Sequence, residues 1–292
     1  MKNSLVVGFI GTGVMGKSMA KHIMNGGYKL NVYNRTKEKA KELLEQGASW
    51  YDTVGGLATN SDVIITIVGY PSDVEQVYLG EDGILQKAKP GSFVIDMTTS
   101  TPLLAQKISK AAKEKGIEAL DAPVSGGDIG AKEGKLSIMV GGDEKAFESV
   151  LPIFSLMGEN IQLQGPAGSG QYTKMTNQIV IAGTMMGVSE AMVYAKKAGL
   201  DQKKVLQSIE TGAAGSFSLS KLAPRMIDGD FDPGFYIKHF IKDMKIAIES
   251  AEEMGLNTPG LKLAKQLYEE LSNQEEGNEN LGTQALYKYY LN

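Results

Sequence analysis

The chain opens with Leu5-Val6-Val7-Gly8-Phe9-Ile10-Gly11-Thr12-Gly13-Val14-Met15-Gly16, and a helical pattern follows through Ile23. An apolar run of this length is typical of a parallel strand that is buried on both faces. The glycines have the spacing G-x-G-x-x-G, which allows a tight turn, a close approach of the backbone to a pyrophosphate and close packing of the next helix. Because they stand between a strand and a helix, residues 11–16 predict a dinucleotide-binding turn.

Apolar runs and helical patterns alternate from residue 29 to about residue 165. The runs at 29–33, near 48, and at 62–68, 93–96, 118–120 and 136–140 are expected to be strands. The segments 37–46, 54–59 and 144–154 are expected to be helices, and Thr101 followed by Pro102 is typical of a helix N-terminus. This alternation predicts a doubly wound α/β domain of the Rossmann type over residues 1–165.

The strand signals end after residue 165. A helical run of roughly 25 residues without proline follows to about Lys197, which corresponds to a rod about 40 Å long. Further helical patterns lie at 202–210, 217–227, 238–254, 261–271 and 282–291. We therefore expect an all-α domain for substrate binding and oligomerisation over residues 166–292, starting with a linking helix at 168–197.

The end of the second expected strand indicates which dinucleotide binds. An acidic residue normally stands there to hydrogen-bond the ribose 2′-hydroxyl of NAD, but this chain has Asn34-Arg35-Thr36. A guanidinium can pair with a 2′-phosphate, and no carboxylate repels that phosphate, so we expect NADP to be preferred over NAD. The alternative is that Arg35 is an ordinary exposed turn residue.

Two further loops are expected beside the cofactor, because ligands of open parallel sheets lie beyond the carboxyl ends of the strands. The first loop contains Val68, Gly69, Tyr70 and Pro71. The second loop lies at 97–101 and contains Thr98.

A small anion site is predicted in the segment Asp121-Ala122-Pro123-Val124-Ser125-Gly126-Gly127-Asp128. Two successive glycines leave backbone N–H groups unshielded, so these groups can donate to a bound carboxylate. The Ser125 hydroxyl can donate to that carboxylate as well. A simple turn is the alternative explanation for Gly126 and Gly127.

Polar side chains recur at helical spacing near the start of the long helical run. Gln171, Lys174 and Gln178 are three and then four residues apart, so they share one face, with Asn177 beside them. An ammonium among carboxamides, downstream of a nucleotide-binding signature, favours a functional group over the alternative of a solvated face.

The pair Lys242-Asp243 lies within the aromatic segment 235–244. These surroundings predict a partly buried pair that needs a partner or a ligand to offset its desolvation. Ordinary surface charge is the alternative.

Composition restricts the partners and the types of site. The 292 residues are 42% hydrophobic, which is enough for sizeable cores. The net charge is −4 with both signs interspersed, so neither nucleic acid nor membrane is an expected partner. Cysteine is absent, and His22 and His239 are expected to be structural, so no metal is expected. No cleavable signal is visible, which makes the cytoplasm the expected location.

Four motifs together resemble those of the β-hydroxyacid dehydrogenases over essentially the whole chain. They are residues 11–16, 121–127 and 168–177 and the pair Lys242-Asp243, in this order and spacing. That family includes 3-hydroxyisobutyrate dehydrogenase, tartronate semialdehyde reductase and the glyoxylate and succinic semialdehyde reductases. Gln178 is a departure, because several members carry asparagine at this position. Tartronate semialdehyde reductases resemble this chain in carrying glutamine there.

The resemblance implies an oxidoreductase that transfers a hydride between NADP(H) and a small β-hydroxyacid or semialdehyde acid. It implies Lys174 as the general acid/base. The other residues that it implies are Ser125, Gly126 and Gly127 on the substrate carboxylate, Asn177 or Gln178 near the substrate, Thr98 beside the nicotinamide, and Lys242 on the cofactor with Asp243 nearby. The alternatives are an imine reductase-like enzyme on the same fold and a non-catalytic NADPH-binding protein.

Two further expectations concern the second half of the chain. The loop 211–218 should contribute to selectivity, with Phe217 limiting the size of the substrate. The all-α half has more apolar helical surface than one sheet domain can cover, so a homodimer or homotetramer is expected.

Overall fold

The computed structural model describes residues 5–291, which belong to two compact units. The first unit is Met1–Lys174 and the second is Met175–Asn292. The division falls inside one long helix, α9 (Ser169–Lys197), because the first turn of that helix is hydrogen-bonded to a strand of the first unit. The sequence-based boundary at residues 165 and 166 lies just before this helix.

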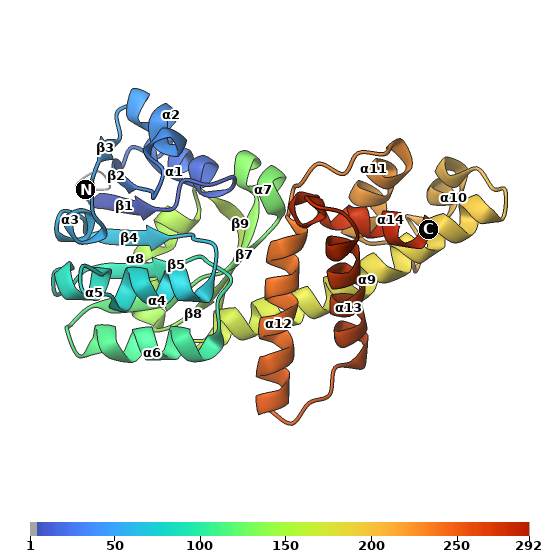
Figure 1. Ribbon diagram of the computed structural model, residues 1–292. Coiled ribbons are helices and arrows are strands. Elements are labelled where there is room, and N and C mark those ends of the chain that lie inside the picture. The colour runs from blue at the N-terminus through green and yellow to red at the C-terminus, as the bar shows by residue number, and fades with distance from the viewer. Residues whose placement is uncertain (1–4, 292) are drawn as a thin grey trace. The chain divides into compact units, whose positions relative to one another are not determined.

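A nine-stranded sheet forms the centre of the first unit (Figure 1). Its order is β3-β2-β1-β4-β5-β6-β8-β7, with β9 paired to β8. Neighbours from β3 to β6 are parallel, whereas β8 runs antiparallel to β6 and β7. The strands are β1 Val6–Ile10, β2 Lys29–Tyr33, β3 Ser49–Trp50, β4 Val63–Thr66, β5 Phe93–Asp96, β6 Glu118–Asp121, β7 Val124–Ser125, β8 Leu136–Gly141 and β9 Gly158–Gly165. The order reverses between β1 and β4, where sheets of this type bind ligands.

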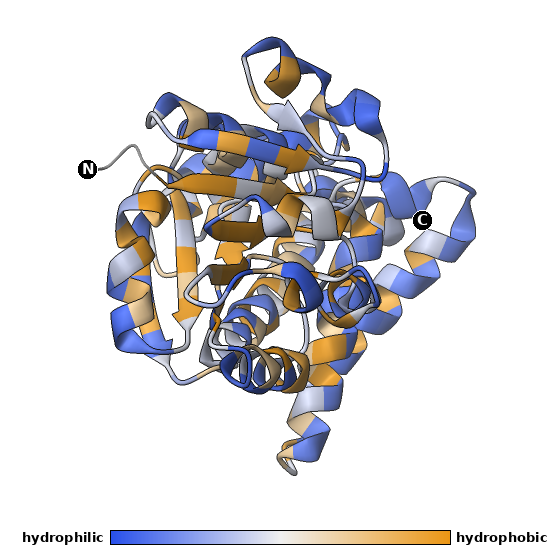
Figure 2. Ribbon diagram, turned by 90° about the vertical axis from the view of Figure 1, so that its left-hand side faces the viewer, coloured by the Kyte–Doolittle hydropathy of each residue, from blue (hydrophilic) through white to orange (hydrophobic). Residues whose placement is uncertain are grey.

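Helices cover both faces of the sheet. Successive residues of one strand point to opposite sides, so Phe9 packs into the core cluster with α1 and α8, and Ile10 into the cluster with α4 and α6. Apolar residues along the strands are visible in Figure 2. The helices are α1 Gly16–Asn25, η1 Lys37–Ala40, α2 Lys41–Glu45, α3 Val54–Thr59, α4 Pro71–Leu79, α5 Ile84–Lys87, α6 Pro102–Lys113, α7 Gly127–Glu133 and α8 Glu144–Phe154. The doubly wound α/β fold is confirmed.

Some elements of this unit differ from the sequence-based expectation. The segment 37–46 is divided into the 3-10 helix η1 and the short helix α2. Strand β9 is missing from the sequence-based expectation, although its residues alternate between Ile161 or Leu163, which pack on the core, and exposed polar side chains. This alternation is typical of a strand with one solvated face. The expected N-cap is confirmed, since Thr101 accepts the N–H of Leu104.

The second unit is built from helices, with one isolated bridge between Tyr236 and Gly282. Its elements are α9, α10 Gln202–Ile209, the π-helical turn η2 Ser218–Leu222, α11 Ala223–Asp228, α12 Ile237–Glu253, α13 Pro259–Gln274, η3 Asn278–Asn280, η4 Thr283–Ala285 and α14 Leu286–Leu291. The expected helix at 217–227 is divided at Ala223, since Pro224 cannot donate a backbone N–H. The all-α character of this half is confirmed.

Two hydrophobic clusters form the core of the second unit. In one, Phe240 of α12 packs edge-on against Tyr268 of α13, with ring centroids 5.2 Å apart. In the other, Met185 and Met192 of α9 are fully buried. Length and apolar composition alone would allow α9 to cross a membrane, which is weak evidence because the core helix of a water-soluble protein has the same properties.

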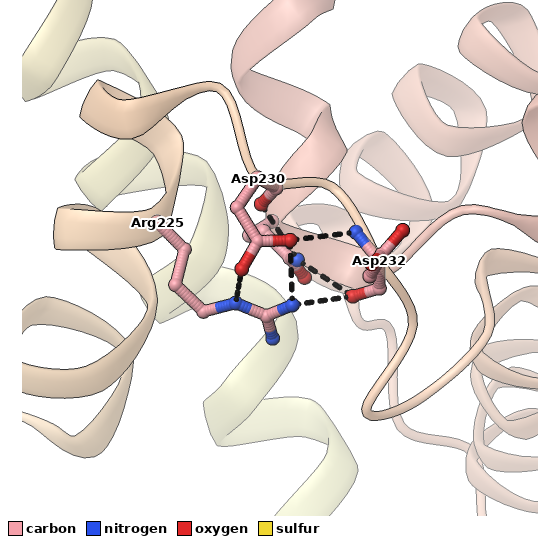
Figure 3. Close-up of polar contacts among 4 residues, drawn as sticks. Arg225, Asp230 and Asp232 are labelled. Atoms are coloured by element: carbon pink, nitrogen blue, oxygen red, sulfur yellow. Dashed lines mark hydrogen bonds and ion pairs between the residues drawn. The ribbon is translucent and has the colours of Figure 1, made fainter.

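Arg225 fixes the segment between α11 and α12 (Figure 3). Its guanidinium donates twice to the Asp230 carboxylate, at 2.7 and 3.0 Å, and once to the carbonyl of Asp232 at 2.7 Å. Gln284 donates to the carbonyls of the same two residues. These bonds define the chain that leads into α12, which carries Lys242.

Candidate active site

The turn between β1 and α1 has the backbone that its glycines predict. Gly11 has a φ of 101°, and a Cβ at this residue would overlap the carbonyl oxygen of Ile67. A Cβ on Gly16 would overlap the carbonyl oxygen of Gly11. At Gly13, in contrast, no atom of residues 5–291 other than its chain neighbours lies within 4 Å of the position of a Cβ. The turn is therefore closed by the protein itself at Gly11 and Gly16 and open at Gly13.

Asn34 holds this turn from the end of β2. Its Oδ1 accepts the N–H of Thr12 at 3.0 Å, and its Nδ2 donates to the carbonyl of Thr36 at 2.9 Å. Val14 is exposed, while Met15 packs partly against the core beneath α1. Asn34 thus links the glycine turn to residues 34–36.

Arg35 is exposed and paired with a residue that the sequence did not indicate. Its Nη1 lies 3.2 Å from Oδ1 of Asp73, and 79% of its side chain is accessible. Oδ2 of Asp73 accepts the N–H of Tyr70 at 3.1 Å, so the same carboxylate caps α4. Gly69 and Pro71, on either side of Tyr70, are half-buried. Asp73 therefore connects Arg35 to the loop after β4.

Thr98 is the centre of a hydrogen-bonded group at the ends of β4 and β5. Its Oγ1 accepts the N–H of Val68 at 3.0 Å, and its carbonyl accepts Nε2 of Gln171 at 2.8 Å. Oδ1 of Asp96 accepts the N–H of Thr98 at 3.0 Å and the hydroxyl of Thr66 at 2.9 Å. Burial raises the pKa of Asp96 to about 6, although its hydrogen bonds with Thr98 act in the opposite direction.

The start of α9 is bonded to β6 through Asp121. One carboxylate oxygen accepts the N–H of Gly168 at 2.7 Å, and the other accepts the N–H of Gln171 at 2.9 Å. Burial raises the pKa of Asp121, and these backbone bonds oppose the rise. Lys174 follows one turn later with 6% of its surface exposed, and Gln171 is completely buried. The alternative of a solvated helix face is therefore wrong for these two residues.

The Ser-Gly-Gly segment forms a sharp turn between β7 and α7. Gly126 and Gly127 have φ values of 126° and 63°, which other residues rarely adopt. Ser125 ends β7 beside the turn. His22 of α1 is a hydrogen-bonded structural residue, as expected, because its Nε2 lies 3.0 and 3.1 Å from two carbonyl oxygens near the end of α7. His22 thereby ties α1 to α7.

In the second unit, a chain of polar contacts ends on Asp243. This carboxylate is 1% exposed, and its Oδ1 lies 2.9 Å from Nζ of Lys242, so the expected buried pair is confirmed and the surface-charge alternative is wrong. Its Oδ2 accepts Nε2 of Gln178 at 2.7 Å. Oε1 of Gln178 in turn accepts Nδ2 of Asn177 at 2.8 Å. The direction of the Gln178 carboxamide is thus fixed by the acid.

Phe217 and His239 also belong to this unit. Phe217 precedes η2, and 62% of its surface is exposed. Burial lowers the pKa of His239, which lies on α12 with Lys242.

The contacts of four residues that organise these groups were not predicted, although Gln171 stands on the predicted polar face and Asp121 in the predicted anion-binding segment; the four are Asp73, Asp96, Asp121 and Gln171. A signal existed for Asp96 and Asp121, since the first ends and the second directly follows a predicted buried strand, where a carboxylate needs partners. The contacts of Asp73 with Arg35 and of Gln171 with Thr98 carry no comparable signal, because the partners lie 38 and 73 residues apart.

Models of protein families match nearly the whole chain. Residues 6–165 match the NAD binding domain of 6-phosphogluconate dehydrogenase, and residues 168–290 match the NAD-binding part of NADP-dependent 3-hydroxyisobutyrate dehydrogenase. The chain is 65% identical to an uncharacterized oxidoreductase of Bacillus subtilis, over 98% of each chain. It is 41% identical to 2-hydroxy-3-oxopropionate reductase of Escherichia coli, over 90% of this chain and 89% of that one. The chain belongs to the β-hydroxyacid dehydrogenase family.

A solved structure agrees with this assignment. The 3-hydroxyisobutyrate dehydrogenase of Mycobacterium tuberculosis with L-serine superposes with a TM-score of 0.89 at 26% identity, over 98% of this chain and 99% of that one. As a member of the β-hydroxyacid dehydrogenase family, the protein is an enzyme that acts on CH–OH groups. Its cofactor is a nicotinamide dinucleotide.

Proposed function

We propose that this β-hydroxyacid dehydrogenase transfers a hydride between NADP(H) and a small β-hydroxyacid or semialdehyde acid, with Lys174 as the general acid/base. The observation that carries the proposal is the burial of Lys174 on the helix whose first turn is bonded to Thr98. An ammonium in a buried position strongly stabilises negative charge that develops on a neighbouring oxygen.

The first unit fits a dinucleotide. The turn is open at Gly13, where a pyrophosphate would approach the backbone. Oγ1 of Thr12 is buried and has no hydrogen-bond partner among residues 5–291. These residues, with the N–H groups at the start of α1, would hold the pyrophosphate. When bound, the nicotinamide supplies or accepts the hydride.

The turn of Ser125, Gly126 and Gly127 would hold the substrate carboxylate. Its positive φ values leave the backbone unshielded by side chains, so the N–H groups and the Ser125 hydroxyl can donate to an anion. Asn177 and Gln178 of α9 would contact the substrate near Lys174, and Phe217 would limit its size. Lys242, held by Asp243, would contact the cofactor.

Lys174 has two tasks in this proposal. During reduction, its ammonium stabilises the alkoxide that develops at the carbonyl and then gives it a proton. During oxidation, the neutral amine must take the proton from the hydroxyl group. The reverse reaction therefore requires the deprotonated form of the same side chain.

The preference for NADP rests on the end of β2. Residues 34–36 contain no acidic side chain, and Arg35 is exposed, so its guanidinium is accessible to a 2′-phosphate. Asp73 places a carboxylate beside this guanidinium, contrary to the expectation that no carboxylate repels the phosphate, and its side chain is only 18% accessible. A 2′-phosphate would therefore compete with Asp73 for the exposed face of Arg35.

A panel of substrates tests the proposal. Succinic semialdehyde, glyoxylate, methylmalonate semialdehyde and tartronate semialdehyde are each assayed with NADPH and with NADH, beside a cyclic imine. We expect turnover of at least one semialdehyde or oxo acid with NADPH. Reduction of the imine alone, or no turnover of any acid, would contradict the proposed function.

We also propose that the protein is a cytoplasmic homodimer or homotetramer. The support is an apolar stretch of α9 that includes Val180 and Tyr194, which are 64% and 76% exposed. Gly183 and Gly187 lie between them with no atom near the position of a Cβ. Light scattering coupled to gel filtration measures the mass, and a monomer at micromolar concentration would contradict the proposal.

A further inference from the structure

Gln171 bonds to the ends of two neighbouring strands at once. Its Nε2 donates to the carbonyl of Thr98 at 2.8 Å, and its Oε1 accepts the N–H of Ser100 at 2.9 Å. Its own backbone N–H donates to Asp121 at 2.9 Å. The carboxamide is therefore hydrogen-bonded to the loop after β5, while the backbone of Gln171 is hydrogen-bonded to the end of β6.

The helix start that carries Gln171 has no room to shift. A Cβ on Gly170 would overlap the carbonyl oxygen of Met139, and it would lie 2.7 Å from the carbonyl oxygen of Asp121. Backbone therefore packs on backbone where α9 meets β6 and β8. Such contacts fix the first turn of the helix more tightly than flexible side chains would.

Lys174 lies three residues after Gln171, about 4.5 Å further along the same helix face. The bonds that hold Gln171 in place therefore also fix the part of the α9 backbone that carries Lys174. Thr98, the partner of the carboxamide, lies in the loop expected beside the nicotinamide. One side chain thus connects the cofactor loop with the helix turn of the acid/base.

We propose that Gln171 is a positioning residue for hydride transfer. Its carboxamide keeps the Thr98 loop and Lys174 at a fixed position relative to each other. This inference rests on the proposed function. The chemistry of the two bonds is directional, because an exchange of the amide nitrogen and oxygen would place donor against donor and acceptor against acceptor. Since Gln171 touches neither substrate nor cofactor in this role, its loss should lower kcat and leave KM nearly unchanged.

Two substitutions separate the two bonds. Gln171→Met has a similar shape and makes neither bond. Gln171→Glu keeps the acceptor for Ser100, but it can donate to the Thr98 carbonyl only when the introduced carboxyl group is protonated. Asn31→Leu is the matched control, because Asn31 is a buried carboxamide of the same unit that donates to Asn60 and Ser61, away from these groups.

The first measurement is hydrogen exchange of the cofactor-free protein. Gln171→Met should accelerate exchange of the Ser100 amide at least about tenfold, because that amide loses its acceptor, while Gln171→Glu should keep it protected. Asn31→Leu should leave the Ser100 amide as in the wild type. Unchanged exchange of Ser100 in Gln171→Met would overturn the inference, whatever the enzyme's substrate is.

The second measurement is the pH profile of kcat relative to the wild type. Gln171→Met should lose about 10²-fold at every pH, the size expected for misplacement by about 1 Å. Gln171→Glu should show the same loss at pH 8 and should recover as the pH falls, because protonation restores the donor. Asp96 on β5 and Asp121 on β6 favour the neutral form of the introduced group, and Lys174 opposes it.

Normalisation to the wild type removes the titration of the native groups from this comparison. A kcat within threefold of the wild type in Gln171→Met, or a loss in Gln171→Glu that is independent of pH, would overturn the inference. Inactivity of the wild type on every acid of the panel would instead overturn the proposed function, and the exchange of Ser100 would still decide whether Gln171 holds the loop.

Discussion

Asp96 and Asp121 occupy paired positions at the carboxyl ends of the neighbouring strands β5 and β6. Asp96 accepts the N–H of Thr98, and Asp121 accepts two N–H groups at the start of α9. Burial raises the pKa of both carboxyl groups, and the charge of Asp121 raises that of Asp96 further. Two adjacent buried acids therefore hold the loop that contains Thr98 and the helix that carries Lys174.

Asp96 should make stability depend on pH. Its pKa of about 6 in the folded protein lies above the usual value, so the folded state binds the proton more tightly than the unfolded state. Its contribution to the free energy of unfolding is therefore fully present below about pH 4, and about 3 kcal/mol is lost as the pH rises through 6. Asp96→Asn cannot titrate and should lack this loss.

Urea unfolding of both proteins between pH 4 and 8 tests this expectation. The difference in the free energy of unfolding between Asp96→Asn and the wild type should change between about pH 4 and 6 and be constant above about pH 7. A difference that is the same at every pH would show that Asp96 does not titrate in this window.

Arg35 should determine the choice of dinucleotide. Arg35→Ala removes the guanidinium that would pair with the 2′-phosphate, so the ratio of kcat/KM for NADPH to that for NADH should fall at least about tenfold, or about 1.4 kcal/mol. Lys39→Ala is the control, because Lys39 is an exposed cation on the same segment. An unchanged ratio in Arg35→Ala would make Arg35 an ordinary turn residue.

Two glycines of the first turn should respond differently to alanine. Gly16→Ala places a Cβ against the carbonyl of Gly11 and should lower the free energy of unfolding by about 1–3 kcal/mol. Gly13→Ala meets no atom of the protein and should keep the Tm of the wild type. Its Cβ would instead meet the pyrophosphate, so the Kd for NADPH should rise at least about tenfold. Tm by calorimetry and Kd by fluorescence separate the two effects, and equal NADPH affinity in Gly13→Ala would contradict the assignment of this turn.

Gln178 should stabilise the buried acid Asp243. Gln178→Asn shortens the side chain by one methylene and removes the 2.7 Å bond, which leaves a buried carboxylate oxygen unsatisfied. The free energy of unfolding should fall by about 1–3 kcal/mol. Gln202→Asn, which loses bonds to a carbonyl and a hydroxyl, should cost only about 1 kcal/mol. Equal losses in the two variants would indicate that the charge of Asp243 has no part in the effect.

The sequence was sufficient where a structure depends on local pattern. Residues 5–16 predicted β1, its glycine turn and α1, and Thr101 predicted a helix cap, because each depends on neighbours within a few positions. Strand β9 has only a weak alternating pattern, since Ile161 and Leu163 are the two apolar residues among its central positions. Its partner β8 supplies the pairing, which a single segment does not reveal.

The candidate site was predictable in residue type but not in its contacts. A lysine among carboxamides indicated Lys174, yet the bonds of Gln171 join it to residues more than 70 positions away. The bond between Gln178 and Asp243 spans 65 positions. Such partners are brought together by the tertiary fold, so the local sequence pattern does not predict these contacts.

The most direct test of the account is the rate of hydride transfer in Lys174→Met, measured in a single turnover with saturating NADPH and the best acid of the panel. The variant should fold and bind NADPH like the wild type, because its side chain fills a similar volume. Its rate should fall at least about 10³-fold, since no group remains to give the alkoxide a proton. A rate within tenfold of the wild type would contradict the assignment of Lys174 as the general acid/base.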